Sequence, residues 1–257
     1  MRVGIVGYGV VGRALEKLFR AGGHHCVVYD KYKDPYTGEE SKDAVNSAQL
    51  VFVAVPTPQD QDGACNLAEV EDVMSWVLPP VCLKSTVIPG TTKSLEERTG
   101  KKVAFSPEYT GETPFHMYRT REIPEVVAVG GNSEVCELVL SVYRKACGSE
   151  PHYFVADAST IELAKYMENC FLAAKVAFVA QFYLLAKQFG ADFTMLREIW
   201  VADSRIGRSH SMVIDKPGYD GRCLPKDMRA LIAASGAPLL RAIDDFNTTL
   251  RGPDGAG

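Results

Sequence analysis

Six residues near the N-terminus constrain the fold of this chain more than any other feature. Gly7-Tyr8-Gly9-Val10-Val11-Gly12 directly follows an apolar run at residues 3–6 and opens a helical pattern at residues 10–21. A G-x-G-x-x-G sequence between a strand and a helix predicts the phosphate-binding turn of a Rossmann βαβ unit. The first glycine permits a tight turn, the second lets the backbone approach a pyrophosphate, and the third allows close packing of helix on strand.

Asp30 extends this prediction to the whole dinucleotide. It ends the next apolar run, at residues 26–29. A carboxylate at this place accepts hydrogen bonds from the ribose hydroxyls and repels a 2′-phosphate, so it favours NAD over NADP. Lys31 and Lys33 weaken that preference. We predict NAD as the cofactor, with a flavin enzyme or a Rossmann domain without a ligand as alternatives.

Short apolar runs continue to alternate with helical patterns up to about residue 155. Runs that are apolar throughout are typical of parallel strands buried on both faces. We therefore predict an α/β fold over residues 1–155, a Rossmann-like, doubly wound and mostly parallel sheet. The further strands are expected at residues 50–55, 81–84, 103–105 and 126–129, and the helices at residues 67–77, 91–97 and 134–146.

Residues 156–251 read as an all-helical second domain. The capping-box sequence Ser159-Thr160-Ile161-Glu162 begins a stretch without proline or glycine until Gly190. Residues 161–189 are apolar nearly all round, which predicts one long central helix buried on several sides. We expect this helix to form a homodimer interface, and a helix enclosed within its own subunit is the alternative. Residues 252–257 are expected to form a disordered tail.

Charge and cysteine content exclude several classes of partner. A net charge of −4 gives no basic field for nucleic acid or an anionic membrane. The seven cysteines form no C-x-x-C pair, which argues against a metal site, and their odd number suits a reducing compartment. We see no signal peptide and no apolar stretch long enough to span a bilayer. We expect a cytoplasmic protein that binds no metal, nucleic acid or membrane.

Three groups of side chains are candidates for chemistry. Cys223 precedes a helical pattern and has basic neighbours, influences that lower a thiol pKa and favour attack on an aldehyde. Lys165 and Asn169 are four residues apart on the long helix and could together stabilise an oxyanion. Glu108 lies in a loop after a strand, where it could act as a general base through water. Each also has an ordinary alternative, as an inert thiol, packed polar residues or a solvated loop.

Seven segments, in the same order, resemble the UDP-glucose/GDP-mannose dehydrogenase family. The resemblance implies a four-electron oxidation of the C6 alcohol of a nucleotide sugar, UDP-glucose foremost, to a carboxylate with two NAD. The segments are GYGVVG at 7–12, VAVPTP at 53–58, KSTVIPGT at 84–91, SPEY at 106–109, LAKYMENCFLAAKVAF at 163–178, DSRIG at 203–207 and GYDGRCLPKD at 218–227.

The resemblance also assigns roles to the matching residues. Cys223 would trap the aldehyde as a thiohemiacetal and later carry a thioester. Lys165 and Asn169 would stabilise the oxyanion, with Asp227 orienting the lysine and a water. Glu108 and Thr86 would handle protons. Further cofactor contacts are implied at Pro56, Thr57, Thr86 and Glu112, and substrate contacts at Glu108, Tyr109, Thr110, Lys165, Asn169, Gly218, Tyr219 and, across a dimer, Arg205.

Departures from the family pattern leave the substrate open. Family members continue into a third, nucleotide-binding domain beyond the length of this chain. Asp220 and Arg222 replace the usual glycine and serine near the sugar pocket. A dehydrogenase of another sugar or alcohol and a non-catalytic NAD-binding remnant are the alternatives. A β-hydroxyacid dehydrogenase shares the architecture but has no need of Cys223.

Overall fold

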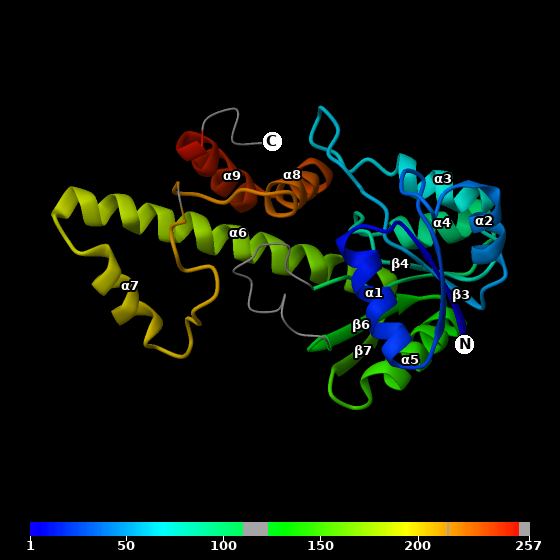
Figure 1. Cartoon of the computed structure of the whole chain (residues 1–257). Helices are drawn as coiled ribbons and strands as arrows, with labels where there is room; N and C mark the ends of the chain where they lie inside the picture. The colour runs from blue at the N-terminus through cyan, green and yellow to red at the C-terminus, as the bar shows by residue number, and fades with distance from the viewer. Residues whose placement is uncertain (110–122, 215, 252–257) are drawn as a thin grey trace. The chain divides into compact units, whose positions relative to one another are not determined.

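The computed structural model describes residues 1–109, 123–214 and 216–251 and divides into two compact units (Figure 1). Unit 1 comprises Met1–Pro58 and Asn66–Lys165, and unit 2 comprises Gln59–Cys65 and the chain from Tyr166 onward. The expected domain boundary between residues 155 and 156 stays a prediction. The two units divide between Lys165 and Tyr166, inside the long helix. The expected tail at residues 252–257 lies outside the described residues.

Unit 1 is built on a seven-stranded sheet with the order β2-β1-β3-β4-β5-β6-β7. Neighbouring strands are parallel except for the antiparallel pair β5 and β6. The predicted α/β, mostly parallel fold is therefore confirmed. The strands are β1 (Arg2–Val6), β2 (His25–Tyr29), β3 (Leu50–Val53), β4 (Val81–Leu83), β5 (Val103–Phe105), β6 (Val126–Gly131) and β7 (His152–Ala156).

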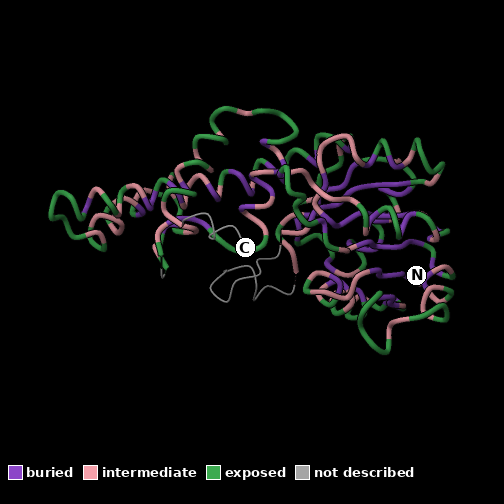
Figure 2. Tube along the Cα trace, turned by 90° about the horizontal axis from the view of Figure 1, so that it is seen from above, coloured by how far each residue is buried: buried purple, intermediate pink, exposed green. Residues whose placement is uncertain are grey.

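Both faces of this sheet are buried, as the apolar strands require. Neighbouring residues of β3 enter different core clusters, since Phe52 packs with Phe19 and Val139 while Val53 packs with Val73 and Leu95. Side chains alternate between the faces of a strand, so a strand apolar throughout needs cover on both sides. Figure 2 shows the resulting buried layer. The unit 1 helices are α1 (Val10–Ala21), α2 (Gly38–Asn46), α3 (Ala68–Trp76), α4 (Thr91–Thr99) and α5 (Ser133–Cys147).

Unit 2 is helical in its described residues and has a small core of its own. This core includes Cys170 and Ala173 from the long helix, Tyr219 from a loop, and Met228 and Ile232 from a later helix. The predicted helical region with one long central helix is confirmed. The helices are α6 (Ala158–Phe189), which begins in unit 1, then α7 (Phe193–Val201), α8 (Leu224–Ser235) and α9 (Pro238–Arg251).

Six large apolar side chains of α6 form one exposed stripe, so the predicted burial on several sides holds only for the rest of the helix surface within one subunit. At about 100° per residue they fall within a sector of about 100°. The buried side of the helix carries small residues such as Ala173, Ala177 and Ala180 together with the fully buried Tyr166. The alternative of a helix enclosed by its own subunit is contradicted, as far as the described residues go. The stripe comprises Leu163, Met167, Phe171, Phe178, Phe182 and Phe189, each 37–76% exposed.

The start of α6 also differs from the predicted capping box. Asp157 accepts hydrogen bonds from the backbone N–H and the hydroxyl of Thr160, at 2.9 and 2.6 Å. Glu162 is fully buried and accepts from Gly90 N–H at 2.6 Å and from Thr92 N–H and Oγ1 at 2.8 and 2.6 Å. Its carboxylate therefore caps α4 rather than α6, because the N–H groups at the start of a helix need acceptors.

The expectation that no stretch is long enough to span a membrane is wrong for α6. By length and composition alone this helix could cross a membrane, with a mean hydropathy of 1.5 and 39% burial in its most apolar window. Core helices pass the same test, so the feature carries no conclusion about membranes. All seven cysteines lie in the described residues, and none of them forms a disulfide bond. The cytoplasmic location stays a prediction.

His24 should make folding stability sensitive to mild acid. It is 5% exposed, and burial lowers its pKa below the ordinary value, with the N-terminal amine and Lys145 acting in the same direction. The unfolded chain then binds the proton more readily, so stability present above about pH 6.5 is lost as the pH falls below that value. His24→Phe is expected to reduce this loss, measured by urea unfolding at pH values on either side.

The neighbouring exposed histidine, His25, provides the control for this prediction. His25→Asn should keep the wild-type dependence of unfolding free energy on pH. An unchanged dependence in His24→Phe would contradict the assignment to His24.

Candidate active site

The glycine-rich turn between β1 and α1 has room for a phosphate group. Gly7 has φ +90°, and a Cβ on Gly12 would lie 2.0 Å from the carbonyl oxygen of Gly7. A Cβ on Gly9 would meet nothing within 4 Å. Helix α1 begins at Val10 with no side-chain cap and no acidic residue in its first turn. Its first N–H groups therefore have no side-chain cap among the described residues, which suits the binding of a pyrophosphate.

The sheet topology places this turn where ligands bind in doubly wound folds. Strand β1 lies between β2 and β3, so the strand order reverses there. Ligands bind outside the carboxyl ends of the strands at such a reversal. Strands β1 to β5 are mutually parallel, and the loops after them carry Glu108 and those predicted cofactor residues that the structure describes. Thr57 Oγ1 donates to Thr86 O at 2.9 Å, which joins two of these loops.

Asp30 follows β2 and is hydrogen-bonded to the glycine-rich turn. Its carboxylate accepts from Tyr8 N–H at 2.6 Å and from Tyr32 N–H at 3.0 Å. Lys31 forms ion pairs with Glu69 and Asp72, at 3.5 and 3.3 Å. Two carboxylates of α3 therefore balance the charge of Lys31. As a result, Lys31 weakens the preference for NAD less than the sequence alone suggests. A small hollow lined by Gly7, Asp30 and Pro56, among others, lies at this place.

Two alanine substitutions separate cofactor binding from folding. Gly9→Ala is expected to leave stability nearly unchanged but to weaken NADH binding, because its Cβ occupies open space where the phosphates would lie. Gly12→Ala is expected to destabilise unit 1, because its Cβ would contact Gly7 O. NADH fluorescence titration and thermal unfolding of both variants test this pair. Full NADH affinity in Gly9→Ala would contradict the assignment.

A buried lysine organises the loop that carries Glu108. Lys84 is 4% exposed and donates from Nζ to Pro107 O at 2.9 Å and to the Tyr143 hydroxyl at 3.0 Å. Its Nζ also lies 3.6 Å from Oε2 of Glu108. Burial raises the pKa of Tyr143 well above its ordinary value, so this hydroxyl stays neutral. Sequence reasoning missed the role of Lys84, although its place at the end of an apolar strand was a usable signal.

Lys165 reaches the same loop from α6. Its side chain is 8% exposed, and Nζ lies 4.7 Å from the ring centroid of Tyr109. In unit 1, Glu108 and Tyr109 therefore lie on the loop after β5, and the predicted site residue Lys165 contacts that loop from α6. Thr110 and Glu112 lie outside the described residues.

The predicted nucleophile lies at the start of α8 in unit 2. Cys223 is the N-terminal cap residue, and its carbonyl oxygen accepts from Asp227 N–H at 2.9 Å. Asp227 is 1% exposed and accepts from Asn169 Nδ2 and from Lys226 Nζ, both at 2.5 Å. The amide nitrogen of Asn169 carries a second hydrogen that could serve a substrate. The predicted role of Asp227 toward Lys165 stays a prediction, and Lys226 is the partner that sequence reasoning missed.

Two other predicted contacts have unexpected surroundings. The Arg205 side chain is 86% exposed and pairs with Asp203 on its own turn. Tyr219 is 2% exposed and packs in the unit 2 core, with its hydroxyl bonded to Asp244 at 2.7 Å. Contacts of Arg205, Gly218 and Tyr219 with substrate stay predictions. Within residues 1–109, 123–214 and 216–251 no group of His, Cys, Asp and Glu side chains suits a metal ion.

These features define a class of protein, a Rossmann dinucleotide-binding domain joined to a helical domain with a thiol at a helix N-terminus. Residues 33–147 match the NAD binding domain of the UDP-glucose/GDP-mannose dehydrogenase family, and residues 159–249 match its central domain. The chain belongs to the UDP-glucose/GDP-mannose dehydrogenase family.

Relatives of known name agree with this membership. The chain is 27% identical to UDP-glucose 6-dehydrogenase AglM of Haloferax volcanii, over 96% of this chain and 69% of the relative. Its structure is similar to a UDP-glucose dehydrogenase from Pyrobaculum islandicum, with a TM-score of 0.84, 27% identity and coverage of 96% and 68%. A 3-hydroxyisobutyrate dehydrogenase from Mycobacterium tuberculosis matches with a TM-score of 0.71 and coverage of 99% and 95%, but at 19% identity it shows the fold alone.

Proposed function

We propose that this protein oxidises the C6 alcohol of a nucleotide sugar to a carboxylate, with NAD as the oxidant and UDP-glucose as the foremost substrate. The observation that carries the proposal is Cys223 at the N-terminus of α8, with buried Asp227 one turn later. A dehydrogenase that stops at the aldehyde needs no thiol, whereas oxidation of an aldehyde to an acid can proceed through a thioester. The names of the relatives support UDP-glucose but belong to those proteins.

The glycine-rich turn, the free N-terminus of α1 and Asp30 would hold NAD. When bound, NAD accepts a hydride from the substrate carbon in each of the two oxidations. In the first oxidation the hydroxyl loses its proton, and the Lys165 ammonium stabilises the negative charge on oxygen. The second amide hydrogen of Asn169 adds a hydrogen bond to the same oxygen.

Cys223 then keeps the aldehyde on the protein. Its sulfur bonds to the aldehyde carbon, and the oxygen takes a proton to give a thiohemiacetal. Loss of the second hydride and of the hydroxyl proton leaves a thioester. Water adds to the thioester carbon, the thiolate of Cys223 leaves, and the carboxylate is released. One alcohol, two NAD⁺ and one water thus give one carboxylate, two NADH and three protons.

Glu108 is assigned the proton of the attacking water. Its carboxylate lies 3.6 Å from the buried Nζ of Lys84, and this ion pair fixes its position. A carboxylate held in this way can accept a proton through hydrogen-bonded water. Thr86, on the loop after β4, is assigned to orient that water.

The stoichiometry of NADH formation tests the proposal. Purified protein is mixed with NAD and a limiting amount of UDP-glucose or another nucleotide sugar, and NADH is counted per sugar consumed. Two NADH per sugar, with a uronic acid product, are expected. One NADH per sugar would contradict the covalent route. NADH binding without turnover on any nucleotide sugar would favour another alcohol substrate or a protein that binds NAD without catalysis.

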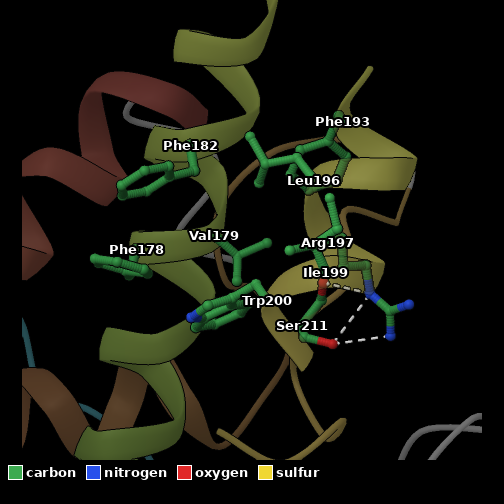
Figure 3. A pocket seen from close by; sticks show the side chains of 9 residues that line it. All are labelled: Phe178, Val179, Phe182, Phe193, Leu196, Arg197, Ile199, Trp200 and Ser211. Atoms are coloured by element: carbon green, nitrogen blue, oxygen red, sulfur yellow. Dashed lines mark hydrogen bonds between the residues drawn. The ribbon is translucent and has the colours of Figure 1, made fainter. Parts of the chain in front are cut away.

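We also propose that the chain forms a homodimer through α6. The exposed stripe defined above continues into an apolar pocket of about 310 Å³ between α6 and α7 (Figure 3). Arg197 at this pocket is held by Ser211, to whose carbonyl oxygen and hydroxyl it donates at 2.9–3.1 Å. Contiguous exposed apolar surface of this kind marks protein interfaces. The pocket is lined by Phe178, Val179, Phe182, Phe193, Leu196, Arg197, Ile199, Trp200 and Ser211.

Sedimentation of two charged variants tests the dimer. Phe171→Glu places a carboxylate on the exposed stripe and is expected to yield a monomer, because burying an unpaired charge is costly. Leu78→Glu, at a residue of unit 1 that is 74% exposed, is the control and should keep the wild-type mass. A monomeric wild-type protein, or a dimeric Phe171→Glu variant, would contradict an interface through α6.

A further inference from the structure

Three residues on one face of α9 hold the segment that leads to Cys223. Asp244, Asn247 and Arg251 are spaced by three and four residues, so they share a face of the helix. All three bond to residues 216–220. The side chain of each is therefore occupied by the loop before Cys223 rather than by solvent alone.

Asn247 makes the most specific of these contacts. Its Oδ1 accepts from Tyr219 N–H at 2.8 Å, and its Nδ2 donates to Tyr219 O at 3.1 Å. The side-chain amide thus bonds both backbone polar groups of one residue. Asn247 is 1% exposed and Tyr219 is 2% exposed, so little water competes for these bonds. A buried amide that is bonded through both its oxygen and its nitrogen fixes its partner firmly.

The other two residues secure the same place. Asp244 accepts from the Tyr219 hydroxyl at 2.7 Å and from Arg229 Nε at 3.0 Å. Arg251 donates to Gly218 O at 2.9 Å and pairs with Asp220 at 3.1 Å. The Tyr219 pKa is raised well above its ordinary value by burial and by Asp244, so the hydroxyl keeps the proton that it donates.

Gly218 packs closely against Asn247, with no room for a side chain. It has φ +96°, and a Cβ there would lie 2.5 Å from Oδ1 of Asn247. The segment between Tyr219 and Cys223 is different, because Asp220, Gly221 and Arg222 are all exposed. Cys223 therefore has two firm anchors, α8 on its C-terminal side and the bonds between Tyr219 and Asn247 on its N-terminal side.

We propose that Asn247 is a positioning residue for the reaction, acting through the backbone of Tyr219 on the location of the Cys223 sulfur. This inference rests on the proposed function, in which that sulfur must meet the aldehyde carbon. A misplacement of about 1 Å can cost on the order of 100-fold in rate. Removal of either bond to Tyr219 should therefore lower kcat and leave NADH affinity unchanged, since the cofactor residues lie in unit 1.

Two substitutions test the two-sided bond. Asn247→Asp preserves shape and the acceptor for Tyr219 N–H, but it places an oxygen opposite Tyr219 O. Asn247→Ala removes both bonds. Each is expected to lower kcat with nucleotide sugar at least about tenfold, with NADH affinity within about twofold of wild type. Thr248→Ala is the control, because among the described residues this exposed hydroxyl bonds only to Asp244 O of its own helix, at 2.9 Å.

Thermal unfolding first confirms that each variant is folded at the assay temperature. A merely structural role would lower the unfolding temperature and leave kcat of the folded variant unchanged. If kcat of both Asn247 variants stays within about twofold of wild type while they are folded, the proposal is overturned.

A chemical readout separates this inference from the proposed function. If the wild-type protein oxidises no nucleotide sugar, the rate of Cys223 alkylation by iodoacetamide decides instead. Cys65, also partly exposed, serves as the internal reference in the same digest analysed by mass spectrometry. A change of about fivefold or more in the ratio of the two rates in both Asn247 variants supports the positioning role of Asn247. A ratio equal to that of the wild type overturns this role.

Discussion

Cys223→Ser is expected to stop carboxylate formation. The thiolate is the nucleophile in the proposed route, and a serine hydroxyl at the same place stays protonated and attacks an aldehyde far more slowly. Loss of a covalent nucleophile reduces turnover by about three orders of magnitude or more. The first oxidation does not need the sulfur, so slow production of NADH and aldehyde should remain.

The measurement is uronic acid formed per NADH, alongside NADH binding by fluorescence. Cys65→Ser is the matched control, because Cys65 is the other partly exposed thiol and the proposed reaction gives it no role. NADH affinity should be the same in both variants, since the predicted NAD residues lie in unit 1. Acid output at the wild-type rate in Cys223→Ser would rule out the covalent mechanism.

Glu162→Ala is expected to cause a large loss of stability in unit 1. The carboxylate is fully buried and accepts three hydrogen bonds from Gly90 and Thr92. Burial raises its pKa, and the three hydrogen bonds oppose that change. Alanine leaves two backbone N–H groups and a hydroxyl without this acceptor. A buried donor without an acceptor costs about 1–3 kcal/mol, so we expect a loss of about 3–5 kcal/mol.

Urea unfolding measures this loss, and Glu97→Ala provides a control on α4 itself. Glu97 is 66% exposed and its only described ion pair is with Lys93 at 3.8 Å, so its removal should change the free energy of unfolding by less than about 1 kcal/mol. Glu162→Gln keeps the shape but turns a donor toward a donor, so an intermediate loss is expected. Equal losses in Glu162→Ala and Glu97→Ala would contradict a capping role for Glu162.

Glu162 also connects the stability of unit 1 with the candidate active site. Glu162 lies three residues before Lys165 on α6, and its bonds to the start of α4 fix where the helix enters unit 1. The loop between β4 and α4 carries Thr86 as well as Gly90. Weakening the Glu162 contact should therefore lower turnover along with stability, without loss of the glycine-rich turn.

Local sequence determined the nucleotide-binding half of this protein. The residues of the glycine-rich turn, the apolar strands and Asp30 are adjacent in sequence or follow a short period. The glycines are required by local backbone angles and the apolar residues by burial of the strand faces, so both can be read from the sequence directly. Helix α2 was missed because Val45 is its only buried residue, so it shows no apolar periodicity. Strand β7 was missed because it is a sheet edge with Phe154 and Val155 more than half exposed.

The long helix shows how far pattern reading reaches. The sequence predicts its length and position, but its apolar content alone suggests apolar residues on all sides. Counting about 100° per residue places six large apolar residues on one stripe and the buried alanines away from it. The arrangement was thus present in the sequence, whereas the exposure of the stripe became visible only in the structure.

Only the tertiary structure decided which polar groups support the candidate catalytic residues. Lys84 lies 24 residues from Glu108 and 59 from Tyr143, Glu162 lies 70 from Thr92, and Asn247 lies 28 from Tyr219. The periodicity of a sequence describes one helix or strand at a time, and it does not specify which loop a helix will contact. Those partners are selected by packing, because a polar group that becomes buried must find a hydrogen bond among whatever neighbours the fold supplies.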